Sequence, residues 1–305
     1  MRSRLSRLLR RSANRLAILL SALLCLGFGP GATAANAGSP GLWQVTSPKG
    51  SLHIMGSVHV LTSADSWITE PIKEAFTGSQ CLALEIDLAT IPADEIGGAL
   101  QRAGRYPADQ GGLQQHVSDE TYARFRDAAA KLAISPESLD RFKPWLVGLV
   151  LDSLISRTLG YYDQYGVDVY FMNHAKASGL PIVGLETLED QVKVLSENDG
   201  LTDDEALSDV LDTLQKTPSL IKVLAGAWRD GDMATIEKKV AEEFADMPED
   251  YDRLIAQRNK HWLPELEKML NTGRNCFIVV GAAHLVGDAS VLKLLRQAGY
   301  TVTRQ

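Results

Sequence analysis

Two histidines far apart in the chain share the same local pattern. His59 and His284 each lie three positions after a glycine and just beyond an apolar run, residues 52–55 and 276–280. Each run predicts a buried strand that ends in a turn. If the two strands are neighbours in one sheet, both imidazoles lie at one edge, which indicates a metal site. The alternative is that each histidine is an ordinary core or turn residue.

Apolar patterning predicts a sheet built from both ends of the chain, with helices between them. Residues 82–88 alternate strictly, with aliphatic side chains on one face and Ala83, Glu85 and Asp87 on the other. Gly179 is placed to end a helix before the next strand. We expect an α/β (mixed α+β) fold, a central mixed sheet covered by a large helical insertion, with active-site candidates at strand ends. The expected strands are residues 42–45, 51–55, 82–88, 181–185, 276–280 and 300–303, and the expected helices are 119–132, 139–159, 167–178, several within 188–270, and 289–298.

The first 37 residues have the pattern of a secretory signal peptide. Six arginines accompany an apolar stretch, residues 16–28, that leads to small residues suited to cleavage at 32–34 or 35–37. The apolar stretch is shorter than the roughly 20 residues that a membrane-spanning helix needs. We therefore expect an exported protein, periplasmic or extracellular, with no stable membrane insertion after cleavage.

The charge of the chain excludes some classes of partner. The full sequence has a formal charge of −7, and the signal segment carries six arginines and no acidic residue, so the remainder has a charge of −13. A chain this acidic is a poor ligand for nucleic acid or an anionic membrane surface. With 45% apolar residues and no Ser/Gly linker or repeat, we expect residues 38–305 to form one domain with a large core.

Two cysteines remain beyond the signal segment, Cys81 and Cys276. Each opens an apolar run that leads toward a candidate site residue, so in neighbouring parallel strands they would lie near the same end of the sheet. An oxidising compartment permits a disulfide between them. The alternative is two separate cysteines that pack as small buried hydrophobes.

Four further polar residues occupy positions where chemistry is possible. Glu85 either faces the surface beside Asp87 or faces the site as an oxygen ligand or base. Glu186 follows a predicted strand and Asp168 lies near a helix start, so each has helix capping as its alternative role. Arg258 falls on the apolar stripe of its helix, where a buried guanidinium requires a carboxylate or a substrate as partner. We expect structural roles for the other histidines, His53, His116, His174 and His261.

A set of short motifs runs through the chain in order. It comprises Gly56-Ser57-Val58-His59, Leu84-Glu85-Ile86-Asp87, Tyr165-Gly166-Val167-Asp168, Gly184-Leu185-Glu186-Thr187 with Gln191, Arg258-Asn259 with Trp262, Val280-Gly281-Ala282-Ala283-His284-Leu285, and the closing Gly299-Tyr300. The ordered set resembles the TraB/PrgY/GumN family, to which the Tiki metalloproteases are related. The resemblance covers nearly the whole mature chain.

The resemblance implies a protease-like fold in which two Gly-x-x-His histidines and a glutamate hold a divalent metal ion. At the matching positions of this sequence these residues are His59, His284 and Glu85, and the ion, Zn, Mn or Co, is open. The fold is also similar to erythromycin esterase-like and haem-binding ChaN-like proteins, so architecture alone does not fix the reaction. Neither an HExxH motif nor a G-x-S-x-G turn is present.

The sequence and the resemblance together predict an exported metal-dependent hydrolase, protease-like, that acts on a peptide or protein. In this hypothesis His59, Glu85 and His284 hold the ion, Glu186 moves a proton, and Arg258 orients a carboxylate or oxyanion. One alternative is a non-catalytic protein that binds a peptide, a metal ion or a tetrapyrrole in the same cleft. The other is an esterase-like hydrolase that acts on a non-peptide substrate without metal.

Overall fold

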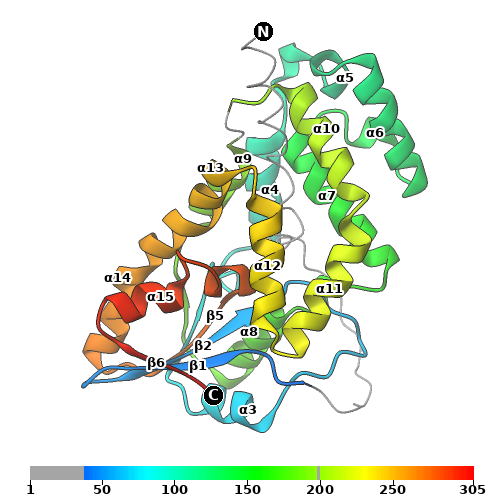
Figure 1. The fold of residues 1–305 in the computed structure, drawn as a ribbon. Helices are drawn as coiled ribbons and strands as arrows, with labels where there is room; N and C mark the ends of the chain where they lie inside the picture. Colours follow the sequence, from blue (N-terminus) through cyan, green and yellow to red (C-terminus); the bar gives the residue numbers. More distant parts are fainter. Residues whose placement is uncertain (1–37, 198–199) are drawn as a thin grey trace.

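The computed structural model describes residues 38–197 and 200–305, and the predicted signal segment lies outside this part of the chain. Within these residues the chain forms a six-stranded sheet with helices on both faces (Figure 1). The strands follow the spatial order β4-β3-β5-β2-β1-β6. Their bounds are Leu42–Thr46 (β1), Ser51–Ser57 (β2), Cys81–Leu84 (β3), Ile182–Gly184 (β4), Cys276–Gly281 (β5) and Thr301–Arg304 (β6).

The sheet is mixed, and both ends of the chain contribute to it, as the sequence predicts. Strands β1 and β2 form an antiparallel hairpin, and β6 pairs antiparallel with β1. Strand β5 lies between β2 and β3 and is parallel to both, while β4 is parallel to β3. Because β2, β5, β3 and β4 run in one direction, their carboxyl ends meet at one edge of the sheet.

Helices occupy most of the chain between and after the first strands. The helical insertion between β3 and β5 is the expected one, and only the short strand β4 interrupts it. The helices are α3 (Glu70–Thr77), α4 (Ala93–Gly104), α5 (Leu113–His116), α6 (Asp119–Lys131), α7 (Pro144–Thr158), α8 (Val167–Ser178), α9 (Leu188–Ser196), α10 (Asp203–Leu214), α11 (Thr217–Arg229), α12 (Met233–Phe244), α13 (Pro248–Tyr251), a π-helical turn (Asp252–Ala256), α14 (Gln257–Thr272) and α15 (Val291–Gln297).

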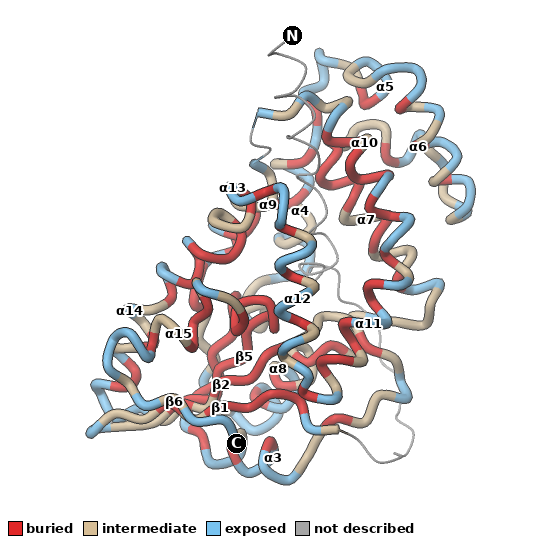
Figure 2. Tube along the Cα trace, viewed as in Figure 1, coloured by how far each residue is buried: buried red, intermediate tan, exposed pale blue. Residues whose placement is uncertain are grey.

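The two faces of the sheet are covered by different helices because side chains alternate along each strand. Met55 and Phe277 pack with apolar residues of α3, α8, α11 and α12 on one face. Ile54 and Ile278, one position away, pack against α14 and α15 on the other face. Figure 2 shows buried residues concentrated in the central strands and on the facing sides of α7 and α10, which extend away from the sheet.

Two element boundaries differ from the sequence prediction by more than two residues. The third strand ends at Leu84 instead of continuing to residue 88, and the chain bends at Glu85 and Ile86. Helix α7 begins at Pro144 instead of residue 139, because proline at the first helical turn is favoured and cannot continue a preceding helix. Helix α8 has the predicted bounds and ends at Gly179, whose φ of 71° is the left-handed conformation that glycine adopts readily.

A disulfide joins Cys81 and Cys276, so the bridge predicted as one of two alternatives is confirmed. The two residues are directly paired in the register of β3 and β5, at the end of the sheet opposite the candidate site. Both are fully buried. The bridge therefore fixes the relative position of two strands whose other ends carry site residues.

None of the helices in the described residues is long and apolar enough to span a bilayer.

Candidate active site

The candidate residues converge at the carboxyl edge of the parallel strands. Ser57, the last residue of β2, pairs with Gly281, the last residue of β5, so His59 and His284 lie just beyond the same edge. Glu85 directly follows β3, and its carbonyl accepts a hydrogen bond of 2.9 Å from the backbone N–H of Glu186 beyond β4. These four residues therefore lie at one edge of the sheet.

Gly281 lies next to three of these side chains, those of Glu85, His284 and His59. Its N–H donates a 2.7 Å hydrogen bond to Oε1 of Glu85. A Cβ atom at this position would lie 3.2 Å from Oε1 of Glu85, 3.5 Å from Cδ2 of His284 and 4.0 Å from Nε2 of His59. The absence of a side chain at Gly281 thus leaves space around which two imidazoles and a carboxylate gather.

The ring of His284 has a defined tautomer. Nδ1 of His284 lies 2.6 Å from Oδ1 of Asn259, whose amide nitrogen donates to the backbone carbonyl of Ala289. That orientation makes the Asn259 oxygen an acceptor, so Nδ1 carries the proton and Nε2 keeps its lone pair. Burial and the charge of Arg258 lower the pKa of His284 to about 3, so this imidazole is neutral at physiological pH.

His59 is held by a carboxylate. Its Nδ1 lies 2.8 Å from Oδ2 of Asp168, near the start of α8. Burial alone would lower the pKa of His59, but the charge and hydrogen bond of Asp168, with the charge of Glu85, outweigh burial and raise it. Helix capping is therefore not the role of Asp168, because Gly166 occupies the N-cap position and the Asp168 carboxylate accepts from His59.

Arg258 lies at the centre of the cluster. Nη2 of this guanidinium is 2.6 Å from Oε2 of Glu85 and 2.6 Å from Oε1 of Glu186, and Nε is 3.0 Å from Oε2 of Glu186. Nη1 donates to Nε2 of His284 at 3.0 Å and to the carbonyl of Leu254 at 3.2 Å. The carboxylate partners expected for a buried arginine are confirmed. The π-helical turn before α14 supplies Leu254, and such turns are frequent at functional sites.

The two glutamates have opposite pKa shifts. Burial would raise the pKa of Glu85, but Arg258, the two histidines and the Gly281 N–H lower it to about 2. For Glu186, burial outweighs the hydrogen bonds and charge of Arg258, and its pKa is raised. Both glutamates are buried, so the surface alternative for Glu85 is wrong. Helix capping is not the role of Glu186 either, since Thr187 caps α9.

Three neighbours of the cluster were not assigned roles from the sequence. Asn259 orients His284, Trp262 donates from Nε1 to Glu186 at 3.0 Å, and Gln191 donates from Nε2 to Glu186 at 3.2 Å. Asn259 and Trp262 are fully buried. The sequence signal for Asn259 was its position directly after Arg258, four residues after Ile255 on the apolar side of the helix. An amide at such a position requires hydrogen-bond partners.

The donor chemistry suits a divalent ion, but the described residues are not arranged as an assembled metal centre. His59 and His284 both have Nδ1 engaged by an oxygen, the arrangement in which Nε2 is available to a metal. However, no group of three or more His, Cys, Asp or Glu side chains in residues 38–197 and 200–305 is placed to hold an ion. An ion at Nε2 of His284 and the hydrogen bond from Arg258 would use the same lone pair, so the two exclude each other.

Comparison with known proteins places these residues in a family. The chain is 24% identical over 246 residues to the uncharacterized protein YbaP of Escherichia coli, covering 80% of this chain and 87% of YbaP. It is 23% identical over 270 residues to an uncharacterized protein of Treponema pallidum, covering 84% of this chain and 80% of that protein. No solved structure matches it significantly. The sequence profile of the TraB/PrgY/gumN family matches residues 41–304, and the chain belongs to this family.

Proposed function

We propose that this protein is a metal-dependent hydrolase with peptide-type substrates, and that His59, Glu85 and His284 hold a divalent ion. The observation that carries the proposal is the meeting of two imidazoles and one carboxylate around Gly281. Asp168 and Asn259 act as the outer partners that fix ligand orientation at many metal sites. Family membership supports the same class of activity by resemblance.

In this proposal a bound divalent ion would supply a Lewis acid and a water molecule that ionises near neutral pH. The other parts come from the chain. Arg258 carries a fixed positive charge that stabilises negative charge developing on a substrate oxygen. Glu186 has the raised pKa that suits a proton carrier, but Arg258, Trp262 and Gln191 all donate to its carboxylate. Its proton-transfer role therefore requires that one of these hydrogen bonds be released. Ion binding at Nε2 of His284 likewise requires that Arg258 release its hydrogen bond to that atom.

The test combines metal content with turnover. Purified protein is reconstituted with Zn, Mn or Co, and cleavage of a diverse peptide library is followed by mass spectrometry with and without chelator. We expect His59→Ala and His284→Ala to lose both bound metal and cleavage, because each removes a ligand from a three-residue set. His174→Ala is the matched control, since His174 is exposed and its ring bonds only to the carbonyl of Tyr170 among the described residues. Wild type that retains no ion contradicts the metal assignment.

A second candidate is hydrolysis without metal, with His59 as general base. The specific observation in its favour is the His59–Asp168 pair, which fixes the imidazole while Arg258 already occupies the lone pair of His284. In that case cleavage survives chelation, and Asp168→Asn lowers turnover by about 10²-fold or more, because general-base catalysis contributes roughly 10²–10⁴. Binding of peptides without cleavage under either condition would instead favour the non-catalytic alternative.

We also propose that the protein is exported. The signal pattern in residues 1–37 and the buried disulfide between Cys81 and Cys276 both suit an oxidising compartment. Amino-terminal sequencing of protein from fractionated cells should find a start near Ala35 or Gly38 in the periplasmic or secreted fraction. An intact Met1 in the cytosolic fraction would contradict export.

A further inference from the structure

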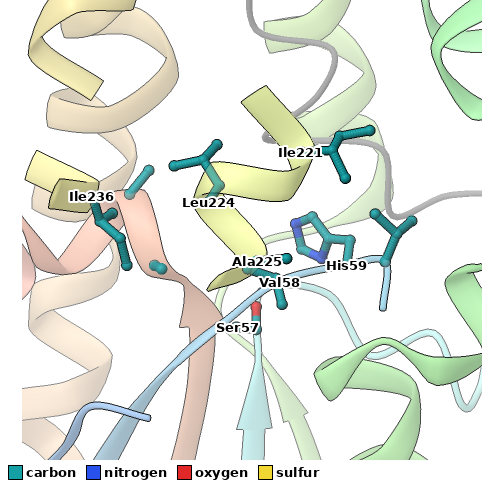
Figure 3. A pocket seen from close by; sticks show the side chains of 10 residues that line it. Ser57, Val58, His59, Ile221, Leu224, Ala225 and Ile236 are labelled. Atoms are coloured by element: carbon teal, nitrogen blue, oxygen red, sulfur yellow. The ribbon is translucent and has the colours of Figure 1, made fainter. Parts of the chain in front are cut away.

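An aliphatic pocket adjoins the candidate site at His59 (Figure 3). It lies between the turn after β2, helices α11 and α12, and the turn after β5. Its lining includes Val58, Ile221, Leu224, Ala225, Ile236 and Ala283. The polar side chains in the lining are those of His59 and Ser57, and no carboxylate, lysine or arginine takes part.

Ser57 gives this pocket a buried polar group without a hydrogen-bond partner among the described residues. The residue is 2% exposed, and its Oγ has no hydrogen-bond partner among the described residues. A buried hydroxyl without a partner costs about 1–3 kcal/mol, so native proteins rarely keep one without a reason. Figure 3 shows the Ser57 hydroxyl at the base of the pocket, beside Val58. It is placed to donate to, or accept from, a bound molecule.

The size of the pocket limits what it can hold. Its volume is about 50 Å³, whereas a cavity measured in the same way needs about 10–15 Å³ to hold one water molecule. The space therefore suits a side chain with a few carbon atoms, and it is too small for an indole or a long acyl chain. Apolar lining favours such a group, because each buried CH₂ stabilises binding.

A second pocket shares His59 but has a different character. Its lining combines several apolar side chains with Gln191 and the carboxylates of Glu85, Asp163 and Asp168. Oδ2 of Asp163 is buried without a hydrogen-bond partner in the described residues. The pocket lined by aliphatic side chains and the pocket that contains carboxylates thus lie next to the same imidazole. In an extended peptide bound across His59, neighbouring side chains of the peptide would therefore face different surroundings.

We propose that the aliphatic pocket binds a small aliphatic side chain of the substrate, of valine or leucine size, next to the bond that is cleaved. This inference rests on the proposed hydrolase function, because it takes the bound molecule to be a substrate that is cleaved. The binding preference itself follows from the apolar lining and the volume of the pocket.

The test measures binding and cleavage separately. The probes are N-acetyl amino-acid amides of glycine, valine, leucine and phenylalanine, with affinities from ligand-observed NMR, and a peptide series that varies the same residue, with kcat/KM for each. Wild type should prefer the valine or leucine member over the glycine member by about tenfold or more, the range typical of apolar pockets. Leu224→Phe, which fills the pocket, should remove this preference. Leu224→Ala, which enlarges it, should shift the preference toward phenylalanine.

The matched control lies one residue away. Val223 is on the same helix, is 41% exposed and does not line the pocket, so Val223→Phe should leave the preference unchanged. If Leu224→Phe does not fold, the gain of phenylalanine binding by Leu224→Ala decides, since damage to the fold cannot create a new preference.

The outcomes separate the two proposals. Equal affinities of wild type for all four probes, or an unchanged preference in the folded Leu224 variants, would overturn the pocket assignment. Cleavage without side-chain preference would do the same and leave the hydrolase intact. Selective binding with no cleavage of any peptide would support the pocket and contradict the hydrolase.

Discussion

Glu85 and Asp152 are buried carboxylates in two different regions of this protein, and burial has opposite results for their pKa values. Glu85, at the edge of the sheet, is 7% exposed and has its pKa lowered to about 2. Asp152, on α7 where it packs against α11, is 2% exposed and has its pKa raised to about 7 by burial. Equal burial therefore does not give equal ionisation.

The difference lies in what each carboxylate contacts. Glu85 receives a hydrogen bond from Arg258 at 2.6 Å and one from the Gly281 N–H at 2.7 Å. Asp152 receives one from the hydroxyl of Thr217 at 3.0 Å, and no charged group contributes to its pKa shift. A guanidinium and a directed backbone N–H stabilise the ionised form of a buried carboxylate, whereas a hydroxyl alone does not. The candidate site is thus a place where the fold maintains charge out of water.

The largest expected effect is that of Arg258→Leu. This substitution would leave the carboxylates of the site buried without a cationic partner, as Asp152 is. Glu85 and Glu186 would be buried without their cation, and loss of one partner of a buried pair costs about 3–5 kcal/mol. Because the pKa of Glu85 lies below its unfolded value, the pair contributes stability above pH 4.5 that is lost as pH falls toward 2. Urea unfolding should therefore show a large deficit at pH 7 that shrinks on acidification.

Arg124→Leu is the control for removal of an arginine. Arg124 pairs with Asp212 at 2.5 Å, but both side chains are more than a third exposed. Surface pairs contribute about 0–1 kcal/mol, so this variant should unfold close to wild type at both pH values. Equal losses in the two variants would show that the buried cation is not what holds the carboxylates charged.

The next largest effect is expected for Asp152→Asn, which should raise the free energy of unfolding relative to wild type as pH rises. Between about pH 4 and pH 7 the unfolded chain releases the Asp152 proton and the folded chain keeps it, so the free energy of unfolding of wild type falls as pH rises. Asparagine removes this loss. Relative to wild type, the variant should gain on the order of 3 kcal/mol between pH 4 and pH 8. Thermal unfolding at both pH values measures this gain.

Asp127→Asn provides the comparison on an exposed position. A surface substitution of this kind should change stability by less than about 0.5 kcal/mol at either pH. If Asp152→Asn and Asp127→Asn give the same small difference between pH 4 and pH 8, Asp152 is ionised in the folded protein and the contrast with Glu85 fails.

Much of this arrangement could be predicted because it depends on local patterns. Apolar runs give the strands, the two Gly-x-x-His turns give the edge where His59 and His284 meet, and an arginine on an apolar stripe predicts carboxylate partners. The end of β3 at Leu84 could not be predicted, because the alternation of side chains continues to residue 88 while the chain bends. That bend is what lets Glu85 reach Gly281 and Arg258.

The partners of the two histidines also lay beyond sequence patterns. Asp168 bonds to His59 across 109 positions in the chain, and Asn259 bonds to His284 across 25. Each contact is set by the packing of α8 or α14 on the sheet, so a local reading of Asp168 gave helix capping as an equal alternative. The position of Arg258 between Glu85 and His284 likewise depends on the π-helical turn, which no periodicity in the sequence indicates.

The smallest expected effect on stability, and the sharpest probe of the charged site, is Gly281→Ala. The backbone at Gly281 has φ of −49° and ψ of 136°, which any residue adopts, so the added methyl brings no backbone strain. It would press on Oε1 of Glu85, 3.2 Å away, and would lie in ordinary contact with the ring of His284, 3.5 Å away. We expect about 1 kcal/mol of lost stability and, under the metal proposal, a tenfold to hundredfold loss of ion affinity. Gly97→Ala, on α4 with open space around it, should instead stabilise the helix by about 0.5–1 kcal/mol and leave ion affinity unchanged. Unaltered ion binding in Gly281→Ala would mean that the ligands do not meet at this glycine.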